Sequence, residues 1–157
     1  MRLHLRLDEL RDPRVFQFLQ AHLADMRRAS PPESVHALDV QALRRPEMRL
    51  WSAWLRVHGE TCLVGTVALK HLSAEHVELK SMRTAEAMRG QGLGRVLLVH
   101  AMAQARQAGH ARISLETGTQ AFFEPAHRLY LAHGFQDCAP FADYRPDPNS
   151  RFMSRAL

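Results

Sequence analysis

Hydrophobic residues recur along this chain at two spacings, and Gly, Pro or Asp residues separate the runs. Strand-like runs of alternating or β-favouring residues lie at 2–7, 48–57, 62–71, 77–84, 112–116, 135–141 and 150–156. Helix-like runs, with apolar residues three or four apart, lie at 13–28, 39–45, 92–108 and 124–133. This order of elements predicts a mixed α/β fold for a single domain over residues 1–157.

Capping and turn residues locate several of the element ends. Asp12 followed by Pro13 is a typical helix start, because Asp caps free amides and proline is tolerated in the first turn. Gly109 and Gly134 each follow a helical run and are expected to be C-caps. The triplet 58–60, His-Gly-Glu, is expected to form the turn of a hairpin.

Neighbouring side chains of a strand point to opposite faces, which assigns faces within the two most informative strands. One face of the strand 77–84 is expected to hold Val77, Leu79 and Ser81, and the other Glu78, Lys80 and Met82. Arg83 then points away from Glu78 and Met82 unless the strand contains a bulge. Trp51 and Trp54 lie on different faces of the strand 48–57 and are expected in a core or an interface.

Composition and charge exclude several classes of protein. The chain has 157 residues, 46% of them hydrophobic and 24% charged, and no stretch is long and apolar enough for a membrane span. A net charge of +5 favours polyanionic partners such as a phosphorylated cofactor, but the basic residues form no continuous stripe, so nucleic acid is not expected. Two distant cysteines and scattered histidines predict neither a disulfide nor a metal site, and free thiols fit a cytoplasmic protein.

Three glycines within five positions separate the strand 77–84 from the helix 92–108: Gly90, Gly92 and Gly94. Glycine lets the backbone approach a ligand closely, and a helix N-terminus offers free amides and the positive end of its dipole. The loop is therefore suited to a phosphate group. A Walker A loop would need Gly-Lys-Ser/Thr, and a Rossmann fold would place its glycines in the first strand–helix unit, whereas this loop fits Arg-x-x-Gly-x-Gly, starting at Arg89.

Residues 89–94, between a strand and an apolar helix, resemble the acetyl-CoA pyrophosphate loop of the GNAT superfamily of N-acetyltransferases. Downstream, Tyr130 stands four residues before Gly134 and Phe135, which resembles the second motif of that superfamily. The two motifs occur in the expected order, and the order of elements over the whole chain also matches. The resemblance implies a mainly antiparallel central sheet, flanked by helices, whose central strands splay apart.

Further segments are similar to a bacterial subgroup of GNAT acetyltransferases. They are Lys-Ser-Met-Arg-Thr at 80–84, Leu-Glu-Thr-Gly at 115–118 and the Pro-rich segment 140–150. Members of the subgroup generally carry proline where this chain has Glu86. That difference lies in the turn between strand and loop, so we do not expect it to alter the phosphate-binding amides.

The resemblance implies acetyl-CoA as a co-substrate, and it implies which residues bind it. The backbone amides that would cradle the pyrophosphate belong to Gly90, Gln91, Gly92, Leu93, Gly94 and Arg95. The main chain around Arg83, at Met82 and Thr84, would pair with the pantetheine arm as an added strand does. Arg89 and Arg95 would add charge to the phosphates, or else are solvated arginines at a helix start.

Transfer to an amine requires a deprotonated amine, stabilisation of the developing oxyanion and a proton for the leaving thiolate. Tyr130 resembles the tyrosine that lies near the thioester sulfur in many family members and is the candidate acid; the alternative is a tyrosine that packs in the core. The amide of Met82 is the candidate donor to the thioester carbonyl. Glu78 is the first candidate base, against a surface glutamate, and Glu116 is the second, although many relatives need no dedicated base.

The expected acceptor is a primary amine on a small molecule, and a protein N-terminus or lysine is the alternative. Arg83, His36 and the loop 143–150 are candidates for the acceptor side of the cleft, where Arg83 would pair with a carboxylate. A rival interpretation is a GNAT-like module that binds CoA without transfer and serves as a sensor. A homodimer is compatible with the edge strands of this architecture.

Overall fold

The computed structural model describes residues 2–37 and 39–157. The strands are β1 (Leu3–Leu7), β2 (Met48–Val57), β3 (Glu60–His71), β4 (His76–Thr84), β5 (Arg112–Gly118), β6 (Gln136–Asp137) and β7 (Ser150–Ala156). The α-helices are α1 (Pro13–Ala29), α2 (Leu93–Gln107) and α3 (Glu124–Ala132), and short 3-10 helices lie at Pro32–Ser34, Ala42–Arg44, Glu86–Met88 and Ala121–Phe123. The seven strands form a sheet in the order β1-β2-β3-β4-β5-β7-β6. All neighbouring strands in this sheet are antiparallel except β4 and β5, which confirms the predicted fold class.

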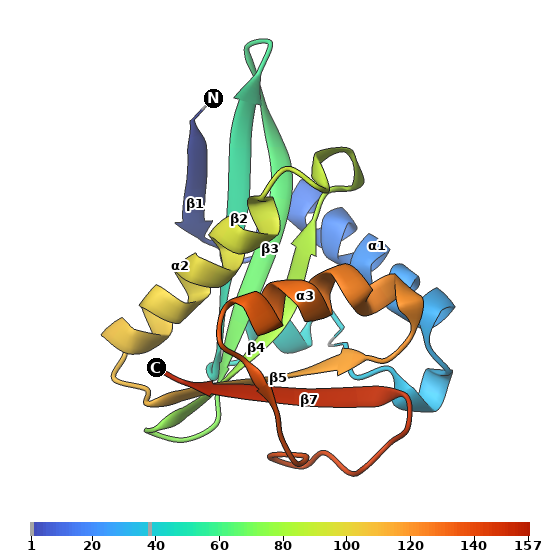
Figure 1. Cartoon of the computed structure of the whole chain (residues 1–157). Helices are drawn as coiled ribbons and strands as arrows, with labels where there is room; N and C mark the ends of the chain where they lie inside the picture. Colours follow the sequence, from blue (N-terminus) through green and yellow to red (C-terminus); the bar gives the residue numbers. More distant parts are fainter. Residues whose placement is uncertain (1, 38) are drawn as a thin grey trace.

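Helices cover both faces of the sheet, with α2 and α3 on one side and α1 on the other (Figure 1). Each side encloses a hydrophobic core. Trp51 of β2 and Leu97 of α2 belong to the first core, and Trp54 of β2 and Leu19 of α1 belong to the second. The two tryptophans are therefore core residues on opposite faces of β2, as predicted.

The hairpin of β2 and β3 turns through two residues, because Val57 pairs with Glu60. His58 and Gly59 both have positive φ, 49° and 86°, which suits the right-handed twist of the strands that they join. The predicted turn is confirmed, although β3 begins at Glu60 rather than at residue 62.

Two expected elements are much shorter in the structure. The helix predicted at 39–45 is only the 3-10 turn Ala42–Arg44, because Pro46 blocks its continuation. Of the strand predicted at 135–141, the described structure has Gln136 and Asp137 paired with β7, and the amide of Cys138 adds one hydrogen bond to the carbonyl of Phe152 at 3.0 Å. Pro140 lacks a backbone donor, so the chain leaves the sheet before it and forms a long connection to β7.

A bulge in β4 changes the side-chain faces predicted for this strand. Ala68 of β3 pairs with Lys80 and Thr66 pairs with Arg83, so the single residue between them on β3 is opposite two residues of β4. One of these two, Ser81, has a φ of 50°, and its carbonyl accepts a hydrogen bond from the Thr66 hydroxyl at 2.9 Å. The bulge inserts one residue and so reverses the alternation of faces beyond it.

Beyond the bulge, Arg83 lies on the same face of β4 as Glu78 and Lys80, toward α1. Arg83 binds Asp25 of α1, whereas Met82 packs against the core beneath α2. The prediction that Glu78 and Met82 share a face is therefore wrong, because simple alternation does not hold across Ser81. Arg83 could face the acceptor side only if the strand contained a bulge, and β4 contains one.

The two central strands separate after three residues. His76–Glu78 of β4 pair with 112–114 of β5, and no pairing continues beyond that point in the described part of the chain. β4 then runs away from β5, and the two diverge visibly (Figure 1). The splay implied by the family resemblance is confirmed. None of the described helices is both long and apolar enough to cross a membrane.

Candidate active site

A cleft of about 690 Å³ opens where β4 and β5 diverge. Residues of α1, β4, the β4–α2 loop, β5 and α3 line it, so the cleft connects the two faces of the sheet. This volume is typical of sites that bind small molecules. The predicted catalytic and cofactor-binding residues line this cleft except Gln91, whose exposed amide side chain donates to the carbonyl of Ala87 at 3.4 Å. Of the candidates for the acceptor side, Arg83 and His36 line the cleft, and the loop 143–150 does not.

The loop before α2 exposes a row of unpaired backbone donors. Gly90 and Gly92 have φ values of 75° and 82°, which only glycine adopts readily, and a Cβ atom at either position would meet no atom within 4 Å. Among the described residues, no protein acceptor binds the amides from Gly90 to Arg95. Free amides at the N-terminus of a 15-residue helix attract an anion, so the loop fits the diphosphate of acetyl-CoA.

Gly94 brings the start of α2 close to α3. A Cβ atom at this position would lie 3.3 Å from the Leu129 side chain of α3 and 4.0 Å from the Thr84 hydroxyl of β4. The third glycine therefore serves close packing, whereas the first two serve backbone conformation.

The edge of β4 that faces β5 carries no strand partner from Leu79 to Thr84 in the described structure. Met82 and Thr84 both lie on this segment and line the cleft. An extended arm that enters here meets free backbone groups in the same way as a strand added to a sheet edge.

Tyr130 of α3 and Glu116 of β5 both line the cleft, and the charge of Glu116 acts on the Tyr130 hydroxyl. Tyr130 is 7% exposed, and burial together with the charge of Glu116 raises the pKa of its hydroxyl, which keeps it protonated. Burial also raises the pKa of Glu116 to about 7, and the charges of Glu78 and Asp147 add to this effect. Lys80 and a 3.3 Å hydrogen bond from the Ser150 hydroxyl oppose the rise without cancelling it.

Glu78 is held in a buried network that sequence reasoning did not find. Its carboxylate accepts a hydrogen bond from the Tyr144 hydroxyl at 2.5 Å and from the Lys80 ammonium at 3.2 Å. The ammonium also donates to the Tyr144 hydroxyl at 2.9 Å and to the carbonyl of His36 at 3.4 Å. Tyr144 stands 66 residues from Glu78, and the only sequence signal for it was the family-like segment 140–150.

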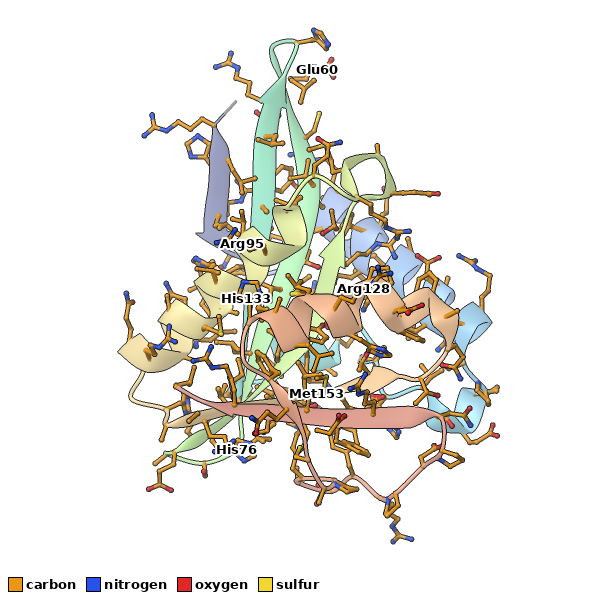
Figure 2. The ribbon with its side chains drawn as sticks, viewed as in Figure 1. Glu60, His76, Arg95, Arg128, His133 and Met153 are labelled. Atoms are coloured by element: carbon orange, nitrogen blue, oxygen red, sulfur yellow. The ribbon has the colours of Figure 1, made fainter. Side chains whose placement is uncertain are left out.

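Arginines of the site gather around one carboxylate of α1. Arg83 is bound to Asp25 at 2.5 Å, and Arg89 lies 3.8 Å from the same oxygen. Arg95 lies on the first turn of α2, exposed at the edge of the cleft (Figure 2). No described group of three or more His, Cys, Asp or Glu residues is arranged to hold a metal ion.

Three connections meet beside the α1 side of the cleft. The Ser34 hydroxyl of the α1–β2 connection donates to Asp147 of the β6–β7 connection at 2.6 Å. Gln120 adds a second link, since it accepts from the Ser30 hydroxyl and donates to Asn149. His36 lines the cleft and packs edge-on against Tyr144, so the loop 143–150 supports residues of the cleft from behind.

Comparison with known proteins agrees with the fold and the geometry of the cleft. The profile of the acetyltransferase (GNAT) family matches residues 15–135. Among curated proteins, an uncharacterized N-acetyltransferase of Escherichia coli, YedL, is 50% identical over 98% of this chain and 94% of its own length. YsnE of Bacillus subtilis, also an uncharacterized N-acetyltransferase, is 46% identical over 99% of this chain and 100% of its own length.

Solved structures share the fold. A proposed acyl-CoA N-acyltransferase of Klebsiella pneumoniae superposes with a TM-score of 0.76 at 28% identity, covering 99% of this chain and 97% of the other. A Bacillus subtilis acetyltransferase solved in complex with CoA superposes with a TM-score of 0.67 at 19% identity, covering 99% of both chains. Because the family profile spans most of the sequence and close relatives span nearly all of it, this chain belongs to the acetyltransferase (GNAT) family and is an acetyl-CoA-dependent N-acetyltransferase.

Proposed function

We propose that this enzyme acetylates a primary amine on a small metabolite by direct transfer within the cleft between β4 and β5. The proposal rests on one observation: a single cleft contains free loop amides, an open strand edge and the titratable side chains of Glu116 and Tyr130. The amides of residues 90–95 would hold the diphosphate, with charge from Arg89 and Arg95. The main chain of Met82 and Thr84 would align the pantetheine arm.

Acetyl-CoA supplies an acetyl group that is activated as a thioester. Glu116 takes a proton from the ammonium group of the acceptor, because a carboxyl with a pKa of about 7 is well matched to this task near neutral pH. The free amine then attacks the thioester carbonyl, so the C–N bond forms and the C–S bond breaks. Tyr130 stays protonated up to this step and donates its hydroxyl proton to the leaving thiolate, and the second proton of the amine nitrogen restores the Tyr130 hydroxyl. Once Glu116 is neutral, its charge no longer raises the pKa of Tyr130, so the first proton transfer favours the second.

Glu78 was the first candidate base, and the buried network favours a different role. Its carboxylate already accepts hydrogen bonds from Tyr144 and Lys80, which occupy the oxygen that they share. We therefore assign Glu78 to hold the acceptor side in place and Glu116 to accept the proton. Replacement of each by glutamine separates the two assignments: loss of the pH-dependent step only in Glu116→Gln supports ours, and loss only in Glu78→Gln supports the other.

The bridge over the α1 side of the cleft supports a small acceptor. The Ser34–Asp147 hydrogen bond joins the α1–β2 and β6–β7 connections, and Gln120 of the β5–α3 connection bonds both Ser30 and Asn149. Because these links hold the border of the cleft in place, a protein segment that needs a wider opening would have to break them, whereas a metabolite would not.

The experiment is a screen for acceptor-dependent CoA release. Purified enzyme with acetyl-CoA is offered amino acids, polyamines, aromatic amines and peptides with a free N-terminus or lysine, and the released thiol is measured. One relative, 37% identical over 88% of this chain, is named an IAA acetyltransferase of Azospirillum brasilense, so IAA joins the panel. Faster release with small amines than with peptides supports the proposal. Release with peptides alone would overturn the small-acceptor assignment, and folded enzyme that binds acetyl-CoA but accelerates no transfer would favour the CoA-binding module.

A further inference from the structure

Three arginines share a single carboxylate on the α1 side of the cleft. Oδ2 of Asp25 binds Arg83 at 2.5 Å and lies 3.8 Å from Arg89, and Oδ1 of Asp25 binds Arg28. The four groups together carry a net charge of +2 when all are ionised. The cluster therefore has more positive charge than its one acidic partner can balance.

Arg83 is the member of this cluster that is both buried and incompletely bonded. Its side chain is 12% exposed, and its Nε atom is buried with no hydrogen-bond partner among the described residues. A buried donor without an acceptor is costly, and the cost is greater for a charged group. The guanidinium also lies over the ring of Phe18, 5.2 Å from its centroid, so its orientation is fixed by α1 on two sides.

A neighbouring histidine, His22, lies close enough to this positive charge to be affected by it. His22 of α1 lines the cleft, and burial together with the charges of Arg83 and Arg89 lowers its pKa to about 4. His22 is therefore neutral at physiological pH and does not add to the charge of the cluster. The ring can accept or donate a hydrogen bond to a bound group.

Lys80, the other cation on this face of β4, has no free donor for a ligand. Lys80 donates to Glu78, to Tyr144 and to the carbonyl of His36, so its three donors all have partners. Because the bulge at Ser81 places Arg83 on the same face as Glu78 and Lys80, the acceptor side has a carboxylate end at Glu78 and Glu116 and a cationic end at Arg83.

We infer that the acceptor of this enzyme carries an anionic group, a carboxylate in the first instance, which binds the guanidinium of Arg83 while its amine lies near Glu116. This inference rests on the proposed amine acetylation and names its substrate class as amino acids or similar amino carboxylates. Arg83 is a specificity residue in this scheme, and Arg89 contributes long-range charge. The diphosphate of acetyl-CoA is a different anion and is assigned to the loop amides of residues 90–95.

The test compares acceptors that carry a carboxylate with matched acceptors that lack its charge. L-Phenylalanine and 6-aminohexanoate are each compared with their carboxamides, which keep the size and remove the negative charge, and kcat/KM is measured with saturating acetyl-CoA. The carboxylates should be preferred by about tenfold to a hundredfold, as expected for a charge-assisted hydrogen bond to a partly buried guanidinium. Arg83→Gln should abolish the preference and leave the KM for acetyl-CoA unchanged.

Arg28→Gln is the matched control, because Arg28 binds the same Asp25 from an exposed position, with a side chain that is 72% exposed. This variant should keep the preference for carboxylates. A preference that survives in Arg83→Gln, or an Arg83→Gln variant whose only defect is a raised KM for acetyl-CoA, would overturn the inference. The second result would assign Arg83 to the co-substrate.

A binding measurement distinguishes failure of the anion site from failure of the proposed acetyl transfer. In calorimetry with CoA present, 3-phenylpropionate should bind and its neutral amide should not, and Arg83→Gln should lose this binding while it retains a wild-type thermal transition. If no amine is acetylated but the acid binds in this Arg83-dependent way, the proposed function fails and the anion site stands. If amines are acetylated but the acid does not bind, the anion site fails and the proposed function stands. Should Arg83→Gln not fold, Arg83→Lys retains the charge and should keep part of the preference.

Discussion

At the residue scale, the proposed chemistry depends on two side chains whose properties come from their surroundings. Tyr130 could be identified from its place before Gly134 and Phe135, because that pattern resembles a family motif. The pKa of Glu116 could not be predicted, because it depends on burial in the folded chain and on groups that come from β4, β7 and the connection between β6 and β7. The unpaired Nε of Arg83 could not be predicted either, because it also depends on how distant segments pack together.

The activity should depend on pH through Glu116. With a pKa of about 7, Glu116 is mostly protonated at pH 6 and cannot accept a proton, and it is mostly ionised at pH 8. We therefore expect kcat/KM to rise between these values with an apparent pKa near 7. Glu116→Gln should be slower by about a hundredfold at pH 8 and should lose this step in the profile. An unchanged profile in Glu116→Gln would exclude this residue as the base.

The Glu116 carboxyl should lower the free energy of unfolding at high pH. Its pKa is 4.5 in the reference state and about 7 in the folded protein, so the folded state binds more protons between these values. Its contribution is favourable below about pH 4.5 and is lost as the pH rises through 7. At pH 8, Glu116→Gln should raise the free energy of unfolding by about 1–3 kcal/mol in urea titrations. The gain should vanish at pH 4, and equal stability at pH 8 would contradict the raised pKa.

Tyr130→Phe tests the proton donor without altering the packing of the ring. The ring contacts Phe135 at 5.7 Å between centroids, and phenylalanine keeps this contact. We expect kcat to fall by about a hundredfold while the Kd for acetyl-CoA stays within about twofold. A wild-type kcat would show that the hydroxyl serves packing alone.

At the element scale, most strands and helices followed from the spacing of apolar residues, and the errors have local causes. Alternation predicted β4 but could not reveal its bulge, since Ser81 adopts a positive φ that its residue type rarely takes. Pro140 and Pro46 shortened the elements before them, and both were visible in the sequence. The contact of Tyr144 with β4 spans 66 residues and has no local signature.

The link between β4 and the β6–β7 connection should contribute strongly to stability. The side chains of Glu78 and Lys80 are 3% and 9% exposed, so removal of one leaves the other charged and buried. Lys80→Met should lower the free energy of unfolding by about 3–5 kcal/mol, and Lys80→Met with Glu78→Gln should recover a part of the loss. Urea denaturation of the four proteins of this cycle measures the coupling, and simple additivity would contradict it.

At the scale of the whole molecule, the fold class could be predicted because two motifs and the order of elements agreed. The loop around Gly92 and the second motif around Tyr130 meet in one cleft, as the resemblance implied. The sequence left the acceptor open, because the acceptor side is built from α1, β4 and two distant connections that come together only in the folded chain. The homodimer with which the edge strands are compatible stays untested.

The most direct test of the account is calorimetric titration of acetyl-CoA into wild type, Gly92→Glu and Gly59→Glu. Gly92 and Gly59 have similar φ values, 82° and 86°, and open space around them, so both substitutions impose the same backbone strain. Gly59 lies at the hairpin tip beside Glu60, far from the loop before α2 (Figure 2). We predict a roughly micromolar Kd for wild type and Gly59→Glu and no measurable binding for Gly92→Glu. Folded wild type that does not bind, or Gly92→Glu that binds as wild type does, would contradict the assignment of the cleft to acetyl-CoA.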